Sequence, residues 1–229
     1  MEVTKTDSEK KKSLLLVIEG LALFMAVHAV SGYYIYPKLA DFYPNVPRLT
    51  MAMLSSAAIS LIAILYLAFR SKHFPKYFMD KQYIIPIVVA GAMASWFIFF
   101  IEISVFNLNK TLSIIQAILK TSDSSYYNLN VFLYVCWSPL IEETLFRGYF
   151  LEMLKGPWGV RFSMLFSSLL FVIPHMKLGG NFVIDFFSVT SFFLFLTSLL
   201  LSVVYIRAGL LAAILVHLFE HLYILFINT

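Results

Sequence analysis

Two carboxylates and a guanidinium lie close together in a stretch of sequence that otherwise carries apolar side chains. They are Glu142, Glu143 and Arg147, within the run Glu-Glu-Thr-Leu-Phe-Arg-Gly. One charge at the middle of a bilayer costs about 2.5 to 3.5 kcal/mol on insertion scales, so three charges in one span require partners, water or a function. The sequence therefore predicts a buried polar site at this position.

The spacing of these charges separates their roles. Glu143 and Arg147 are four residues apart and share one face of an α-helix, while Glu142 points about 100° away. We expect Glu143 to pair with Arg147, which leaves Glu142 available as a general base. The competing interpretation is a structural cluster of all three charges, although buried ion pairs are usually poor stabilisers.

Three histidines follow on later apolar segments. Phe171-Val-Ile-Pro174-His175 places one histidine directly after a proline, which predicts a kink or a helix end there. His217 and His221 are four residues apart on one helix face, so their imidazoles can jointly hold a water, an oxyanion or a metal ion. Carboxylates and imidazoles together can form a general-base or a metal site.

The elements that must position these residues are apolar segments of a membrane protein. Of the 229 residues, 60% are hydrophobic, above the roughly half of soluble domains, and the excess comes in blocks of about 20 residues. We predict an all-α, polytopic transmembrane helical bundle of about seven to eight helices, with residues 1–229 as a single integral membrane domain and 131–227 as the catalytic core helices. The short apolar segment 111–119 is predicted to lie in the interface or to re-enter. The seven predicted spans are 14–36, 50–69, 83–106, 131–154, 160–174, 183–206 and 210–227.

The distribution of basic residues predicts the orientation. A cytoplasmic N-terminus places eleven Lys and Arg residues in inner segments and five in outer segments, with Arg147 set aside inside a helix. The inner residues are Lys5, Lys10, Lys11, Lys12, Arg70, Lys72, Lys76, Lys81, Lys155, Arg161 and Arg207, and the outer residues are Lys38, Arg48, Lys110, Lys120 and Lys177. The first apolar block is predicted to be a retained helix rather than a signal peptide, which fits a prokaryotic plasma membrane. The net charge of +4 follows from this bias and gives no reason to invoke nucleic acid.

Taken in order, the three motifs resemble the CAAX prenyl endopeptidase and bacteriocin-processing superfamily, also called the Abi family of intramembrane proteases. Its pattern is E-E-x-x-x-R, then F-x-x-x-H, then H-x-x-x-N on three different helices. The resemblance covers about residues 131 to 225. The matching residues are Glu142, Glu143 and Arg147 for the first motif, Phe171 and His175 for the second, and His217 for the third.

The resemblance implies roles for these residues. Glu142 and His175 would hold and activate a water, and His217 and the residue four later would stabilise the oxyanion. That residue is His221 here, where the family has asparagine. A neutral histidine protonated on the appropriate nitrogen, or an imidazolium, can donate a hydrogen bond as asparagine does. The implied protein is a glutamic membrane endopeptidase without bound metal, acting within membrane lipid on a lipidated, CAAX-like or hydrophobic peptide or protein.

A zinc enzyme is a second interpretation of the last motif. His217-Leu-Phe-Glu220-His221 also reads H-x-x-E-H, in which two histidines bind zinc and the glutamate activates water. The third ligand would come from His175 or Glu142.

Two further interpretations involve no peptide hydrolysis. The fold can serve as a non-catalytic membrane scaffold or immunity protein that binds another membrane protein. Chains of Glu and His in a membrane can also carry protons in a transporter, although no inverted repeat of interrupted helices is visible.

The single cysteine, Cys136, excludes an intrachain disulfide and a cysteine metal cluster. No feature of the sequence specifies an oligomeric state.

Overall fold

The computed structural model describes residues 7–30, 37–38, 41, 43, 45–71, 84–106, 125–176, 184 and 186–227. The predicted interfacial segment 111–119 lies outside these residues. Every element in the described part of the chain is helical. The all-α class predicted from the sequence is therefore confirmed.

Each of the seven predicted spans corresponds to helical structure. The N-terminal half contributes α1 (Asp7–Val30), α3 (Arg48–Ser71) and α4 (Ile84–Phe106). The C-terminal helices are α9 (Val160–Val172), the short 3-10 helix η5 (Ile173–His175), α11 (Val189–Ala208) and α12 (Leu210–Ile227). Between the two sets, the charged motif lies on a helical rod made of α6 (Tyr127–Phe132), η3 (Leu133–Trp137), α7 (Ser138–Glu143), η4 (Thr144–Leu151) and α8 (Glu152–Trp158). The segments η3 and η4 are π-helical.

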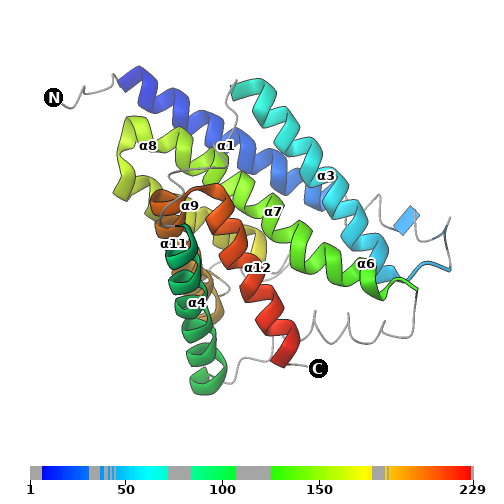
Figure 1. Ribbon diagram of the computed structural model, residues 1–229. Helices are drawn as coiled ribbons and strands as arrows, with labels where there is room; N and C mark the ends of the chain where they lie inside the picture. Colours follow the sequence, from blue (N-terminus) through cyan, green and yellow to red (C-terminus); the bar gives the residue numbers. More distant parts are fainter. Residues whose placement is uncertain are drawn as a thin grey trace.

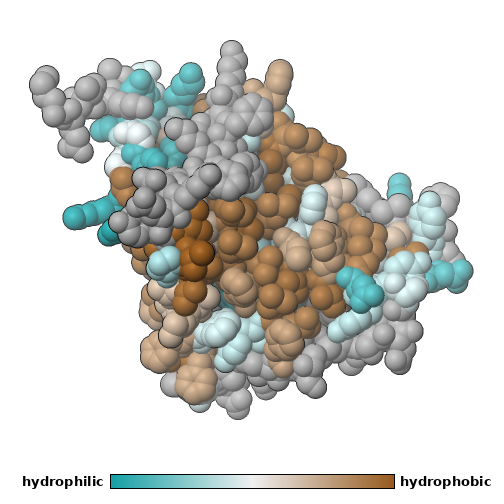
Figure 2. Space-filling view, viewed as in Figure 1, coloured by the Kyte–Doolittle hydropathy of each residue, from teal (hydrophilic) through white to brown (hydrophobic). Residues whose placement is uncertain are grey.

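Several of the described helices are apolar, and some have the length of a membrane span. Three of them are long and apolar enough to cross a bilayer, namely Arg48–Arg70, Ile84–Glu102 and Val189–Ala208, and Val160–His175 and Leu210–Phe226 are shorter apolar helices. In Figure 2 apolar residues cover the middle of the visible face, and hydrophilic residues gather toward its edges. Large apolar side chains such as Phe69 point outward, which suits a surface solvated by lipid. The protein is an integral membrane helical bundle.

The charged rod occupies the centre of the bundle. Figure 1 shows α7 crossing next to α12, with α1 and α3 lying side by side on one flank and α4 on the other. A buried apolar cluster around Phe146 and Phe150 joins the rod to α1, α3 and α9. Gly20 of α1 permits close packing there, because a Cβ at this position would lie 2.8 Å from Leu67 Cδ2 and 2.9 Å from Phe150 Cε1.

Glycines and a proline set the helix ends that bring the motifs together. Between the predicted spans 131–154 and 160–174, Gly159, whose φ is +82°, separates α8 from α9, and Pro157 remains inside α8. Gly209, with φ of +89°, separates α11 from α12. The end predicted near His175 is confirmed, since α9 gives way to the tighter turn of η5 at Pro174.

Candidate active site

A fully buried ion pair anchors the site. Arg147 Nη1 lies 2.7 Å from Glu143 Oε1, and neither side chain is exposed. Arg147 Nη2 also donates to both the backbone carbonyl and the hydroxyl of Ser198 on α11, each at 2.8 Å. The pairing of Glu143 with Arg147 expected from their spacing is present, and it ties the rod to α11.

The same carboxylate orients a histidine of another helix. Glu143 Oε1 accepts a hydrogen bond from His217 Nδ1 of α12 at 2.9 Å. A carboxylate oxygen can only accept here, so Nδ1 of His217 carries a hydrogen and Nε2 is the ring nitrogen left for chemistry. Glu143 therefore connects a cation to an imidazole and fixes the orientation of both.

Glu142 lies between two imidazoles. Its Oε2 atom is 3.8 Å from His175 Nε2 and 3.9 Å from His217 Nε2. Its other oxygen, Oε1, accepts a hydrogen bond from the hydroxyl of Ser138, one turn earlier on the rod. Glu142 is thus held by one oxygen while the other faces both histidines.

The antiparallel packing of α9 on the rod brings His175 to Glu142. Ser167 of α9 donates to the carbonyl of Phe146 at 2.7 Å, and Phe171 lies one turn farther with its ring 4.9 Å from the Arg147 guanidinium carbon. His175 lies one more turn along the same face and ends beside Glu142. Three residues spaced by four therefore align α9 with the charged motif.

His221 joins the same group from α12. Its ring lies edge-on to the His217 ring, with centroids 4.7 Å apart, and stacks on the Tyr134 ring at 4.4 Å and 13°. Its Nδ1 atom is 2.7 Å from the backbone carbonyl of Tyr134. Because a carbonyl can only accept, Nδ1 is the donor, and in the neutral ring Nε2 then carries a lone pair.

All six residues predicted for the site thus come together from three separate parts of the chain. Three of their neighbours were not predicted from the sequence. Ser138 could have been found, since it lies four residues before Glu142 on the same helix face. Ser198 and Tyr134 bind Arg147 and His221 from distant segments of the chain, and no local sequence pattern indicates such contacts.

The environment of the His217-Leu-Phe-Glu220-His221 motif differs from the environment expected of a zinc site. Glu220 Oε2 accepts a hydrogen bond from the Ser95 hydroxyl of α4 at 2.8 Å. Among the residues that the structure describes, no group of three or more His, Cys, Asp or Glu side chains is arranged to hold a metal ion. The two ring nitrogens Nδ1 of His217 and His221 are bonded to protein oxygens.

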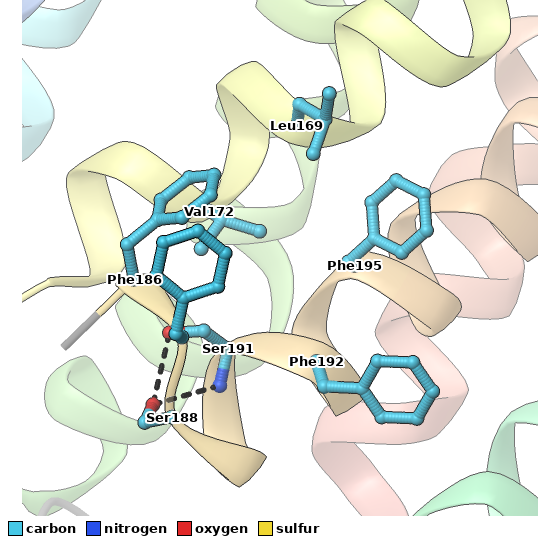
Figure 3. Close-up of a pocket in the computed structure, with 8 residues that line it drawn as sticks. Leu169, Val172, Phe186, Ser188, Ser191, Phe192 and Phe195 are labelled. Atoms are coloured by element: carbon cyan, nitrogen blue, oxygen red, sulfur yellow. Dashed lines mark hydrogen bonds between the residues drawn. The ribbon is translucent and has the colours of Figure 1, made fainter. Parts of the chain in front are cut away.

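An apolar hollow of about 230 Å³ lies beside the end of α9 that carries His175. Figure 3 shows side chains of α9 and of the start of α11 around it, with Ser188 bonded to Ser191 at the helix N-terminus. Its lining contains no titratable side chain, so the chemistry belongs to the carboxylate and imidazole cluster. The lining residues are Leu169, Val172, Phe186, Phe187, Ser188, Ser191, Phe192 and Phe195.

Comparison with known proteins finds a family resemblance in the part of the chain that carries these residues. Residues 124–223 match the protein family described as type II CAAX prenyl endopeptidase Rce1-like. No curated protein and no solved structure matches the chain. The matched range contains every residue of the cluster described above. Through residues 124–223 the chain is similar to the type II CAAX prenyl endopeptidase Rce1-like family.

Proposed function

We propose that this protein is an intramembrane glutamic peptidase that cleaves a peptide bond in a lipidated, CAAX-like or hydrophobic peptide or protein. The observation that carries the proposal is the meeting of one Glu142 oxygen with two histidine Nε2 atoms at 3.8 and 3.9 Å, each from a different helix. One water oxygen can lie within about 3 Å of Glu142 and of either imidazole at these separations. A carboxylate and an imidazole that share a water form a general-base pair.

The proposed reaction begins with that water. Glu142 Oε2 takes one proton from it, and the lone pair of His175 Nε2 accepts the hydrogen bond of the other. The water oxygen forms a bond to the carbonyl carbon of the scissile peptide, and the carbonyl π electrons move onto oxygen. When the tetrahedral intermediate collapses, the C–N bond breaks and Glu142 returns its proton to the leaving amine. The products are an amine and a carboxylic acid, which loses its remaining proton to solvent, with no cofactor consumed.

His217 is the proposed donor to the oxyanion. Its Nδ1 hydrogen is bound by the Glu143 carboxylate, and a carboxylate partner stabilises a ring that carries a second proton on Nε2. Such a ring donates from Nε2 to the negative oxygen. Glu143 and Arg147 are then positioning residues, because they act on the reaction through His217.

The proposed environment is membrane lipid, with the N-terminus and the opening of the site on the cytoplasmic side. Lys10, Lys11 and Lys12 lie near the start of α1. Lys155 and Arg161 lie on α8 and α9, and the packing of α8 on α1 and α9 brings these basic residues to the same end of the bundle. A prokaryotic plasma membrane accounts for this bias.

Glu142→Gln provides the direct test. The variant keeps the side-chain shape but removes the base, so cleavage of a fluorogenic farnesylated CAAX peptide in detergent should fall by about 10²-fold or more. Glu152→Gln is the matched control, because Glu152 lies ten residues farther along the rod, where it accepts from Tyr205 and pairs with Lys155. It should keep the activity of the parent protein.

Two results would contradict the proposal. Cleavage by Glu142→Gln at the rate of the parent would remove the general base, and absence of cleavage by the pure parent protein with several lipidated and hydrophobic peptides would favour a scaffold. Metal dependence is tested separately. Activity should survive a chelator and dialysis, and zinc that remains at one ion per chain together with loss of activity on its removal would support the zinc mechanism.

A further inference from the structure

Two histidines of the site are held in the same way by two different aromatic residues. His221 Nδ1 bonds to the carbonyl of Tyr134 at 2.7 Å, and the two rings stack with centroids 4.4 Å apart. His175 Nδ1 lies 2.8 Å from the carbonyl of Phe171, and those rings are 4.6 Å apart. In each case one residue supplies both an acceptor for Nδ1 and a flat surface for the ring.

A carbonyl inside a helix normally has a backbone donor, so each of these two requires a reason to be available. For Tyr134 the α-helical donor is the N–H of Ser138, but in the π-helical η3 this N–H bonds instead to the carbonyl of Leu133. The π-helical donor for Tyr134 would be residue 139. That residue is Pro139, which has no N–H. Its position therefore frees the Tyr134 carbonyl.

The Phe171 carbonyl is available for a similar reason, but in a 3-10 helix instead of a π-helix. Backbone bonds from Ile173 to Leu170 and from Met176 to Ile173 show that the chain follows the 3-10 pattern, in which each carbonyl accepts from the third residue on. The third residue after Phe171 is Pro174, which again lacks an N–H. The Phe171 carbonyl is thereby available to the ring of His175.

We propose that Tyr134 with Pro139 and Phe171 with Pro174 form two positioning clamps, which fix His221 and His175 as Nδ1–H tautomers with Nε2 left for the reaction. The inference rests on the proposed peptidase function for its catalytic meaning, whereas the tautomers themselves are a property of the folded protein. Each proline lacks a backbone N–H and so leaves one carbonyl without its helical donor.

The clamps give the two histidines a definite chemical role. A neutral ring with its hydrogen on Nδ1 presents Nε2 only as an acceptor. His175 can therefore receive a hydrogen bond from the water that Glu142 activates. His221 likewise accepts, from water or from a substrate N–H, and donation to an oxyanion falls to His217, whose Nδ1 partner is a carboxylate rather than a carbonyl.

The test is the ring ¹⁵N NMR spectrum of full-length protein labelled with ¹⁵N-histidine in detergent micelles. The Nδ1 and Nε2 shifts identify which nitrogen carries the hydrogen, and His175→Asn and His221→Asn assign the signals by their loss. The parent protein should show Nδ1–H at both histidines. Pro139→Ala supplies an N–H that competes for the Tyr134 carbonyl, so the tautomer ratio of His221 should move toward Nε2–H by roughly threefold to tenfold, the range set by one ordinary hydrogen bond.

Matched variants separate the clamps from general effects. Pro174→Ala should shift His175 and leave His221 unchanged, and Pro157→Ala, which alters a proline inside α8 away from the site, should shift neither. With the farnesylated peptide, the two clamp variants should lower kcat and leave KM within about twofold, since they affect the reacting groups rather than substrate binding.

An Nε2–H tautomer at either histidine of the parent protein would overturn the inference, and so would tautomers that stay unchanged in a folded Pro139→Ala variant. Because the spectra require no substrate, they decide this question even if the peptide is not cleaved. Failure of the peptidase proposal is thus distinguishable from failure of the clamps.

Discussion

Glu142 and Glu143 are neighbours in sequence, yet the structure predicts that their replacement by glutamine has opposite consequences. Glu143 is completely buried, and its Oε1 atom contacts both Arg147 and His217. Glu143→Gln leaves the guanidinium of Arg147, which is also completely buried, without its carboxylate. Removing one partner of a buried ion pair costs about 3 to 5 kcal/mol, because the other charge remains away from water. Glu142 is partly exposed, with 17% of its side chain accessible. In the described part of the chain it accepts a hydrogen bond from Ser138, and the two histidine Nε2 atoms lie farther away, at 3.8 and 3.9 Å.

The free energy of unfolding measures this difference. Far-UV circular dichroism during titration of sodium dodecyl sulfate into non-ionic micelles should show Glu143→Gln destabilised by about 3 kcal/mol or more. Glu142→Gln should remain within about 1 kcal/mol of the parent and lose activity instead. Glu152→Gln is the control for removal of a partly exposed carboxylate, since its pair with Lys155 is partly exposed and such pairs contribute about 1 kcal/mol or less.

Equal free energies of unfolding for Glu143→Gln and Glu152→Gln would refute the expected destabilisation from loss of the buried Glu143–Arg147 pair. That result would mean that Ser198, whose carbonyl and hydroxyl both accept from Arg147, supports the cation without a counter-charge. Equal loss of stability in Glu142→Gln and Glu143→Gln would also refute it, because the two carboxylates would then share one structural role.

Two further predictions concern pH dependence and orientation. His221→Asn replaces a ring nitrogen that only accepts with an amide that also donates, so the activity should fall without extension to higher pH. Glu142, His175 and His217 face this ring together with Tyr134 and are unchanged in the variant. An extended alkaline limb in the pH profile would show that His221 acts as an imidazolium donor. Lys11 is exposed near the start of α1. Lys11→Cys in a Cys136→Ala background should therefore react with a membrane-impermeant maleimide only when the cytoplasmic face is accessible. Labelling of this cysteine in intact cells would reverse the proposed orientation.

Local sequence patterns were sufficient for the parts of the site that depend on helical periodicity. The pairing of Glu143 with Arg147 follows from a spacing of four, and so does the common face of His217 and His221. Pro174 likewise predicted the end of α9 at His175, which the structure places in a 3-10 turn. These features depend on residues within one or two turns of each other, so the sequence contains the information needed for them.

The partners of those residues depend on packing between helices, which the local patterns do not determine. Ser198 reaches Arg147 across 51 positions and Tyr134 reaches His221 across 87. The π-helical segments η3 and η4 were not predicted either, because their backbone bonding departs from the periodicity that identified the span. Pro139 was the available signal of irregular backbone bonding in this rod, because a proline inside a helix leaves a carbonyl without its backbone donor, so that another donor can bind there.

The depth of His175 shows why counting residues along a span is insufficient. At 1.5 Å per residue, His175 lies about 21 Å from Arg161, whereas Glu142 lies about 12 Å from the end of its own span near residue 150, and on that count the two should not meet. They meet because side-chain contacts, rather than the position of its first residue, set the position of α9 along the rod. Ser167 of α9 donates a hydrogen bond to the Phe146 carbonyl, and from there α9 runs antiparallel to the rod as far as the contact of His175 with Glu142. The position of a helix along its axis is set by such side-chain contacts with its neighbour. The sequence pattern specified which face of α9 carries Phe171 and His175, and the packing against the rod specified their depth.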